Sequence, residues 1–199
     1  TMGLVVALAF SPSLATGAET GHPAGVHVTP YLQQVTETGI TVRWETTLPV
    51  LGSVEYGQDG RFDQVAAEKD AALLHEVFLT GLRPGETYNY RVLSGGEPLP
   101  EATFATAPPK GTETWRFVAY GDNRSNPDTH SRVVEQIIRA KPDIVLTTGD
   151  LVARGNQYLL WKREFFDPVA PLSRSVPIFV SLGNHENHAQ HYFDYFTFP

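Results

Sequence analysis

The chain has 199 residues, a formal net charge of −7 and no cysteine. That length suits one or two domains, and a hydrophobic fraction of 41% is enough for ordinary packed cores. The negative charge argues against binding to a nucleic-acid backbone, which requires a basic surface. Without cysteine the chain has no disulfide framework and no thiolate for a metal, so any metal ligand must come from Asp, Asn, Glu or His.

Residues 1–18 have the pattern of the remnant of an export signal. Residues 3–10 form an apolar run that is too short to cross a membrane, and Ser13-Leu-Ala15 fits the small-x-small cleavage rule. The basic segment that opens such signals is missing, and a frayed apolar N-terminus is the alternative. No later segment is long and apolar enough for a membrane span. We therefore predict a secreted, periplasmic or cell-surface protein with no membrane span after signal removal.

Residues 24–107 show an apolar periodicity of two, which predicts β-strands. Ile40-Thr-Val-Arg-Trp44 alternates, so Ile40, Val42 and Trp44 face one side of the sheet and Thr41 and Arg43 the other. Similar alternations follow, separated by turn signals such as Pro84-Gly85 and Gly95-Gly96. Several short strands at this spacing predict a β-sandwich. Trp44 and the tyrosines of this segment are expected in its core rather than in a ligand cage.

Residues 108–114 form a linker that Pro108 and Pro109 stiffen, and from residue 115 onward the pattern changes to strand–helix–strand. Asn126 is expected to cap a helix that ends at Lys141-Pro142, and a second helix is expected to begin near Asn156. The expected buried residues of the first helix are Val133, Val134, Ile137 and Ile138, and those of the second are Tyr158, Trp161, Phe165 and Val169. Strands near 116–121, 143–148 and 177–182, joined by these helices, predict a parallel sheet.

Each predicted parallel strand ends at a glycine followed by a polar side chain. The three motifs are Gly121-Asp-Asn-Arg124, Gly149-Asp-Leu-Val152 and Gly183-Asn-His-Glu186. Their polar residues are 28 and 34 residues apart (150 − 122 and 184 − 150). Because parallel strands end at one edge of a sheet, Asp122, Asp150 and Asn184-His185 should meet there. Carboxylate and amide oxygens beside an imidazole are the groups found in the active site of a metal-assisted hydrolase.

In this order the motifs resemble the first three signature blocks of calcineurin-like metallophosphoesterases. The preceding sandwich makes the chain similar to purple acid phosphatases in particular, as do Pro30-Tyr-Leu and Val54-Glu-Tyr-Gly57. Leu82-Arg-Pro-Gly-Glu-Thr-Tyr88 resembles the tyrosine corner of fibronectin type III domains. The expected fold is therefore multidomain: a fibronectin type III-like β-sandwich over 24–107, followed over 115–199 by the N-terminal part of an α/β metallophosphoesterase domain.

The resemblance also implies roles for the residues of the motifs. Two divalent or trivalent metal ions (Fe, Zn or Mn) are expected, with Asp122 on the first, Asp150 bridging both and Asn184 on the second. His185 would not bind metal but would stabilise the transition state or protonate the leaving oxygen. Glu186 is expected to orient that imidazole. His188 and His191 are expected to be solvated rather than ligands. Taken singly, either aspartate is more typical of a helix cap or a loop.

Two positions depart from the family pattern. Many metallophosphoesterases have Asp-x-His in the first block, where this chain has Arg124. Purple acid phosphatases have a tyrosine ligand three residues after the second aspartate, where this chain has Ala153. The planar guanidinium of Arg124 suits a pair of phosphate oxygens, so Arg124 and its neighbour Asn123 are predicted to bind substrate. An exposed arginine engaged only in salt bridges is the alternative.

These features predict an exported dinuclear-metal phosphoesterase that hydrolyses phosphate monoesters by metal-hydroxide attack. A phosphodiesterase or nucleotidase on the same scaffold, or a non-catalytic exported binding protein, are the alternatives. The histidine ligands of the family's later blocks have no counterpart before Pro199, so the chain is expected to be C-terminally truncated and by itself inactive. A phosphate ester is the only partner these residues imply.

Overall fold

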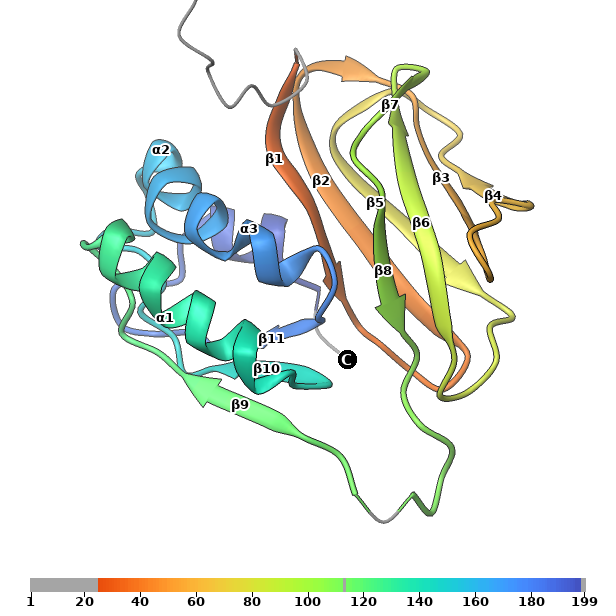
Figure 1. Cartoon of the computed structure of the whole chain (residues 1–199). Helices are drawn as coiled ribbons and strands as arrows, with labels where there is room; N and C mark the ends of the chain where they lie inside the picture. The colour runs from red at the N-terminus through yellow and green to blue at the C-terminus, as the bar shows by residue number, and fades with distance from the viewer. Residues whose placement is uncertain (1–24, 113, 198–199) are drawn as a thin grey trace, which may run out of the picture.

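The computed structural model describes residues 25–112 and 114–197, and the predicted export signal lies outside them. Within the described residues the first part of the chain has eight strands. They are β1 (Val26–Gln33), β2 (Gly39–Val50), β3 (Gly52–Gly57), β4 (Gln64–Ala67), β5 (Ala72–Thr80), β6 (Thr87–Ser94), β7 (Glu97–Pro98) and β8 (Ala102–Ala105). Strands β1-β2-β5 form one antiparallel sheet, and β4-β3-β6-β7 form the other, with β8 also paired to β6. Figure 1 shows the two sheets face to face on the right of the molecule.

The core between the two sheets consists of the side chains that the alternating pattern placed on one face. Ile40, Val42 and Trp44 are fully buried there, and the Trp44 ring stacks on His75 with ring centroids 4.4 Å apart. The hydroxyl of Tyr88 accepts a hydrogen bond of 2.9 Å from the Arg83 backbone N–H, which holds the chain where it crosses between strands. Trp44 and Tyr88 are therefore core residues, as predicted.

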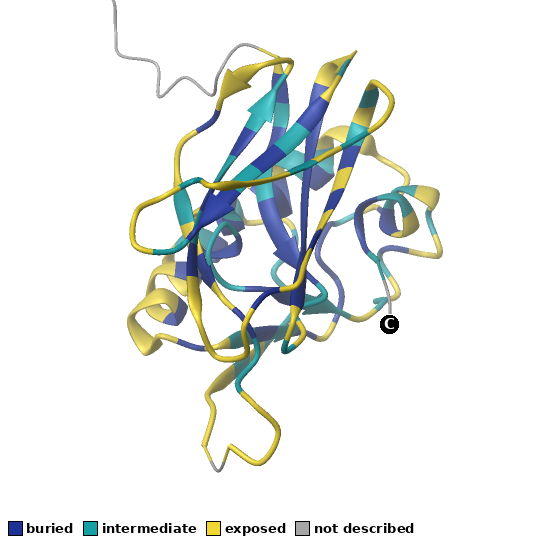
Figure 2. Ribbon diagram, turned by 90° about the vertical axis from the view of Figure 1, so that its right-hand side faces the viewer, coloured by how far each residue is buried: buried dark blue, intermediate teal, exposed yellow. Residues whose placement is uncertain are grey.

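The opposite face of the β1-β2-β5 sheet is also buried, because the second part of the chain packs against it. Thr41 and Arg43 have only 1% and 6% of their surface exposed although they point away from the sandwich core. Val28 and Tyr31 of β1 belong to the same hydrophobic cluster as Phe166 and other residues of the second part. Figure 2 shows buried residues, in dark blue, both in the sandwich strands and in the helices that lie behind them. The two parts thus share a core and are not joined by the linker alone.

The second part of the chain is an α/β unit with a parallel sheet. Its elements are β9 (Phe117–Tyr120), α1 (Pro127–Ala140), β10 (Ile144–Thr147), α2 (Tyr158–Leu160), the π-helix η1 (Trp161–Phe166), α3 (Asp167–Ser173), β11 (Ile178–Val180) and α4 (Gln190–Tyr195). The strands are parallel and lie in the order β11-β10-β9, which confirms the predicted parallel sheet. Helix α4 and the π-helical turn were not predicted from the sequence.

Helix α1 begins and ends as its sequence predicted, but its buried face is different. Asn126 caps it by accepting the Thr129 backbone N–H at 3.1 Å, and Lys141 ends it in a left-handed conformation. Val134 and Ile137 are buried, whereas Val133 and Ile138 are about 40% exposed, so the predicted four-residue apolar stripe is wrong at two positions. The buried His130 takes part of its place. A helix packed on a narrow three-stranded sheet buries a narrower stripe than its apolar pattern suggests.

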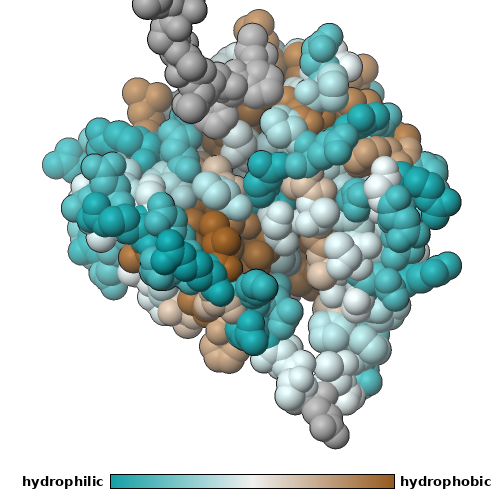
Figure 3. Space-filling model, viewed as in Figure 1, coloured by the Kyte–Doolittle hydropathy of each residue, from teal (hydrophilic) through white to brown (hydrophobic). Residues whose placement is uncertain are grey.

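The helices cover only one face of the parallel sheet. In Figure 1, α1 and α3 lie above β9-β10-β11 and no described element lies below it. The uncovered face carries Phe117, Ala119, Ile144, Leu146 and Phe179, which the strand register brings to the same side. Phe117 and the neighbouring Trp115 are more than half exposed, and Figure 3 shows apolar side chains along this lower edge, where β9 runs. Parallel sheets are normally covered on both faces, so this face is exceptional.

Polar contacts of a buried carboxylate join the two parts near the apolar interface. Glu45 of β2 accepts hydrogen bonds from the hydroxyls of Tyr158 at 2.7 Å and Tyr195 at 2.9 Å. On the same side, Tyr31 donates from its hydroxyl to the backbone carbonyl of Tyr195 at 2.7 Å. Arg43 donates to the Asp194 carbonyl at 2.6 Å. Helix α4 is therefore fixed to the sandwich by side-chain hydrogen bonds as well as by apolar packing.

None of the helices in the described part of the chain is long and apolar enough to cross a membrane.

Candidate functional site

The site is built where β9 and β10 end. Asp122 and Asp150 follow these strands and both adopt the left-handed conformation, with φ of 53° and 56°. This conformation is uncommon outside glycine, although Asp tolerates it better than most residues, and such strained residues gather at functional sites. The glycine before Asp150 is required by space, because a Cβ on Gly149 would lie 2.5 Å from the Gly183 backbone nitrogen. The glycines of the motifs therefore allow the three rim loops to pack closely together.

The two aspartate carboxylates converge on one atom of Arg124. Arg124 Nη1 lies 2.7 Å from Asp122 Oδ1 and 2.9 Å from Asp150 Oδ2. Asp122 is largely exposed, Asp150 has 11% of its side chain exposed, and Arg124 lies between these extremes. The hydrogen bond that Arg124 donates to Asp122 and the charge of Asp150 outweigh the effect of burial and raise the pKa of the Arg124 guanidinium above its ordinary value. Two carboxylates from neighbouring strands thus hold a single cationic nitrogen.

Asn184 and His185 follow β11 at the same end of the sheet. The backbone N–H of His185 donates to Asp150 Oδ1 at 3.0 Å, which brings the third motif against the second. The His185 ring places Nδ1 2.9 Å from the carbonyl of Ala153, so Nδ1 carries a proton and Nε2 is the nitrogen left for proton exchange. Asn184, the residue before it, is exposed. The structure therefore brings Asp122, Asp150, Asn184 and His185 to one rim.

Glu186 does not orient His185, so that expectation is wrong. Its fully buried carboxylate accepts backbone N–H groups from Asp150, Leu151 and Gly183 at 2.7–2.9 Å, and from Val152 at 3.3 Å. The imidazole is instead held by the Ala153 carbonyl. Turning loops leave backbone N–H groups without secondary-structure partners, and a buried carboxylate satisfies several of them at once. Glu186 is therefore the residue that fixes the second and third motifs to each other.

Glu164 has an equivalent role that sequence reasoning missed. Its buried carboxylate accepts the backbone N–H of Ser125 at 3.1 Å and that of Ala153 at 2.7 Å, which joins the first motif to the second. Burial raises the pKa of Glu164, but Arg163 and the two backbone donors outweigh it and hold the pKa below its usual value. The signal in the sequence was a charged residue three positions after Trp161, inside the apolar stripe. It lies in the π-helix, a feature that is frequent at functional sites.

Asn123 points inward and not toward the rim. Its amide nitrogen donates to the Leu151 carbonyl at 3.1 Å and lies 3.3 Å from His130 Nδ1, while its amide oxygen is buried without a hydrogen-bond partner in the described residues. His130 is buried between the Tyr120 hydroxyl and the Glu164 carbonyl, and burial lowers its pKa. These contacts hold the loop after β9 in place, so they support a structural role for Asn123, and its predicted substrate contact remains a prediction.

The donor atoms fit part of the predicted metal centre. Two carboxylate oxygens within 3 Å of one cationic atom have the arrangement that a shared cation requires. In the described ranges no group of three or more His, Asp, Glu or Cys side chains gathers around one point. His188 is exposed, and His191 contacts the ring of Tyr158 and lies 3.9 Å from Asp194. The described residues therefore fit one cation between Asp122 and Asp150 and do not complete a closed site for two.

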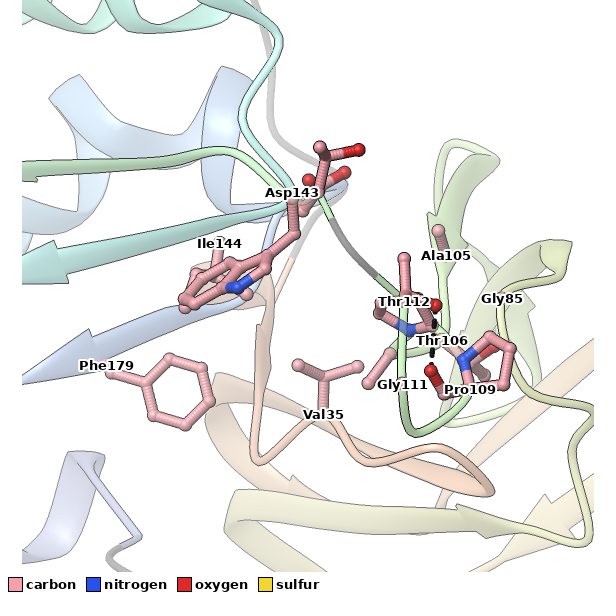
Figure 4. Close-up of a pocket in the computed structure, with 14 residues that line it drawn as sticks. Val35, Gly85, Ala105, Thr106, Pro109, Gly111, Thr112, Asp143, Ile144 and Phe179 are labelled. Carbon is pink, nitrogen blue, oxygen red and sulfur yellow. Dashed lines mark hydrogen bonds between the residues drawn. The ribbon is translucent and has the colours of Figure 1, made fainter.

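Two clefts lie at opposite ends of the parallel sheet. The first has a volume of about 420 Å³ and is lined by residues of the first motif together with Tyr120, Asn126, Thr129 and Val133. The second, of about 470 Å³, lies between the sandwich loops and the uncovered sheet face, where Val35, Ile144 and Phe179 point toward a common space in Figure 4. The first cleft is lined by Asp122, which has a left-handed backbone, and by its ion-pair partner Arg124, so it is the better candidate for chemistry.

Comparison with known proteins agrees with this arrangement. Residues 23–107 match the family model of the purple acid phosphatase N-terminal domain, and residues 116–199 match that of the calcineurin-like phosphoesterases. "Probable inactive purple acid phosphatase 1" of Arabidopsis thaliana is 27% identical over 139 residues, which cover 59% of this chain and 22% of that protein.

Two solved structures share the fold over most of the chain. Purple acid phosphatase PPD1 from seeds of yellow lupin (Lupinus luteus) matches with a TM-score of 0.70 at 21% identity, over 88% of this chain and 41% of that one. The structure of PhoD matches with a TM-score of 0.61 at 14% identity, over 84% of this chain and 40% of that one. The chain thus spans less than half the length of these relatives. Its sandwich, its partial metallophosphoesterase unit and the two family matches show that the chain belongs to the purple acid phosphatase-like metallophosphoesterases.

Proposed function

We propose that the protein is an exported, acid phosphatase-like hydrolase of phosphate monoesters that uses two metal ions. The observation that carries this proposal is the convergence of the Asp122 and Asp150 carboxylates at the ends of adjacent parallel strands, 2.7 and 2.9 Å from one cationic atom. Family members use a dinuclear metal centre, and in this chain Asp122, Asp150 and Asn184 would hold the ions. Fe, Zn and Mn all suit such oxygen-rich sites when imidazole ligands complete them.

The bound metals would neutralise the charge of the phosphate and lower the pKa of the attacking water. The residues of the chain then have separate tasks. The Ala153 carbonyl keeps a proton on His185 Nδ1, so the proton that the imidazolium form would donate to the leaving oxygen is the one on Nε2. Arg124, once free of the carboxylates, offers a planar pair of N–H donors to two phosphate oxygens. Glu164 and Glu186 hold the loops that carry these side chains.

The sandwich is proposed to be fibronectin type III-like, which the contact between the Tyr88 hydroxyl and the Arg83 backbone N–H supports. Export to the periplasm, the cell surface or the medium is proposed from the apolar run at residues 3–10 and the small residues that follow it.

A non-catalytic binding protein is the second candidate. The Arabidopsis thaliana relative is named as an inactive purple acid phosphatase. In this chain Arg124 stands where many metallophosphoesterases have a histidine ligand, and its guanidinium contacts both carboxylates. A rim of this kind still presents a cation and an imidazole to a phosphate group, so it would bind phosphate esters without hydrolysing them.

The experiment that tests the enzyme compares His185→Ala with His188→Ala in the full-length protein. His188 is a matched control because it is an exposed histidine three residues away. We expect His185→Ala to lower kcat for p-nitrophenyl phosphate by about 10²–10⁴-fold, with metal content by mass spectrometry close to that of the wild type. His188→Ala should change neither quantity.

Equal losses of metal and activity in His185→Ala would make His185 a ligand and overturn its assigned role. A wild-type protein that binds metal but hydrolyses no phosphate ester would contradict the enzyme and favour the binding protein.

A further inference from the structure

Arg124 occupies the point at which the two candidate metal ligands meet. Its Nη1 atom, and not two separate nitrogens, makes both short contacts, to Asp122 Oδ1 and to Asp150 Oδ2. These carboxylates are the ion-pair partners of Arg124 in the described part of the chain. A metal ion bound by the same two oxygens would lie where this nitrogen lies. One position cannot hold two cations. The guanidinium and a metal ion are therefore alternatives.

The backbone keeps Arg124 within reach of this position. The Arg124 N–H donates to the Asp150 carbonyl at 3.3 Å, and the next residue, Ser125, donates its N–H to the buried Glu164 carboxylate at 3.1 Å. Its side chain is only 27% exposed. The loop thus holds the base of the side chain beside the carboxylates while the long side chain itself can turn away.

The rim does not depend on Arg124 for its shape. Asp150 is held by its own N–H, which donates to Glu186, and its Oδ1 accepts the His185 backbone N–H at 3.0 Å. Arg124 forms its ion pair only with the other carboxylate oxygen of Asp150, Oδ2. The ion pairs of Arg124 are therefore an addition to a loop arrangement that Glu186 and Glu164 already fix.

We infer that Arg124 is a built-in competitor for the metal: its guanidinium closes the cation position between Asp122 and Asp150 until a metal ion displaces it. This inference rests on the metal site of the proposed function. It goes beyond that function because it makes metal binding and the release of Arg124 a single event. Displacement would turn the guanidinium from the carboxylates toward solvent, where it becomes available for an anionic substrate. An arginine at this position would then lower metal affinity and couple metal loading to phosphate binding.

The test measures Mn²⁺ binding by equilibrium dialysis to the full-length protein and to three variants of it. Arg124→Gln removes the competing charge, and Arg124→His also restores the Asp-x-His pattern. Arg139→Gln is the matched control, because it removes the same charge from an exposed position in the last turn of α1. We expect Arg124→Gln to bind Mn²⁺ about ten-fold more tightly than the wild type, a difference of about 1.4 kcal/mol. Arg124→His should bind more tightly still, and Arg139→Gln should stay within about two-fold of the wild type, as expected for a distant charge screened by salt.

Equal affinities in Arg124→Gln and Arg139→Gln would overturn the competitor while leaving the metal site intact. No saturable Mn²⁺ binding by any of the four proteins would contradict the metal centre of the proposed function itself. A second measurement needs no variant: the ¹⁵N–¹H signal of the Arg124 Nε group should move to the position of a free arginine as Zn²⁺ is added. A signal that stays unchanged while Zn²⁺ binds would show that the two cations do not exclude each other.

Discussion

The sandwich and the α/β unit both bury glutamates, but they use them differently. Glu45 on the outer face of the sandwich accepts two phenol hydroxyls, so it joins side chains of the two parts across the interface. Glu186 and Glu164 in the α/β unit accept backbone N–H groups instead, so they fix the course of three loops. The buried glutamate of the sandwich therefore supports the fold, whereas those of the α/β unit position the rim loops. Functional residues need loops, and loops leave backbone donors that must be satisfied.

The largest expected effect is that of Glu186→Ala. It leaves four backbone N–H groups of the rim without their acceptor. Because each unsatisfied buried group costs about 1–3 kcal/mol and water will enter to satisfy some of them, we expect the free energy of unfolding to fall by about 4 kcal/mol. Urea denaturation followed by circular dichroism measures this change. Glu135→Ala, at an exposed position of α1, is the control and should change stability by less than about 0.5 kcal/mol. A similarly small change in Glu186→Ala would show that the carboxylate does not hold the loops.

A smaller effect is expected where tyrosines cross between the two parts. Burial raises the pKa of the Tyr31 and Tyr195 hydroxyls well above the ordinary value, and for Tyr195 the neighbouring Glu45 adds to the shift. In the unfolded chain a tyrosine ionises near pH 10. Above that pH the unfolded state binds fewer protons than the folded state, so the free energy of unfolding falls as pH rises. Each such tyrosine contributes a slope of about 1.4 kcal/mol per pH unit.

Tyr195→Phe sharpens this expectation, because it removes one ionising group from the interface. The variant should lose about 1 kcal/mol at pH 7 through the lost hydrogen bond to Glu45. Between pH 10 and pH 11.5 its stability should fall less steeply than that of the wild type. Urea denaturation at several pH values measures both slopes, and identical slopes would mean that Tyr195 ionises in the folded protein as easily as in the unfolded chain.

The smallest expected effect lies on the uncovered face of the parallel sheet, where neighbouring residues of β9 provide a matched pair. Phe117 points to the uncovered face and is 52% exposed, whereas Val118 packs against the helices. We expect Phe117→Thr to change the free energy of unfolding by less than about 0.5 kcal/mol, and to reduce self-association in sedimentation velocity. Val118→Thr should cost more than about 1 kcal/mol because it places a hydroxyl in a core. Equal costs would show that the face below the sheet is covered in solution.

Much of the architecture could be predicted from the sequence, because local patterns have direct structural meanings. The period of two in Ile40–Trp44 identified a strand and the side chains of its inner face, and the Asn126 cap and Lys141 end bounded α1. Three apolar runs ending in glycine were enough to predict parallel strands whose polar ends meet. Asp122, Asp150, Asn184 and His185 do lie at that edge, since parallel strands place their carboxyl ends together.

What covers each face, and where each polar group finds its partner, was decided only by the tertiary structure. Thr41 and Arg43 look like solvent-facing residues but are buried by the α/β unit, while Val133 and Ile138 look like core residues but are exposed. Glu186 accepts hydrogen bonds from four backbone N–H groups and not from the expected partner His185. Glu164 joins loops that lie far apart in the sequence. Periodicity reports which side chains share a face. It carries no information on the element that packs against that face, or on which backbone N–H groups a loop leaves unsatisfied.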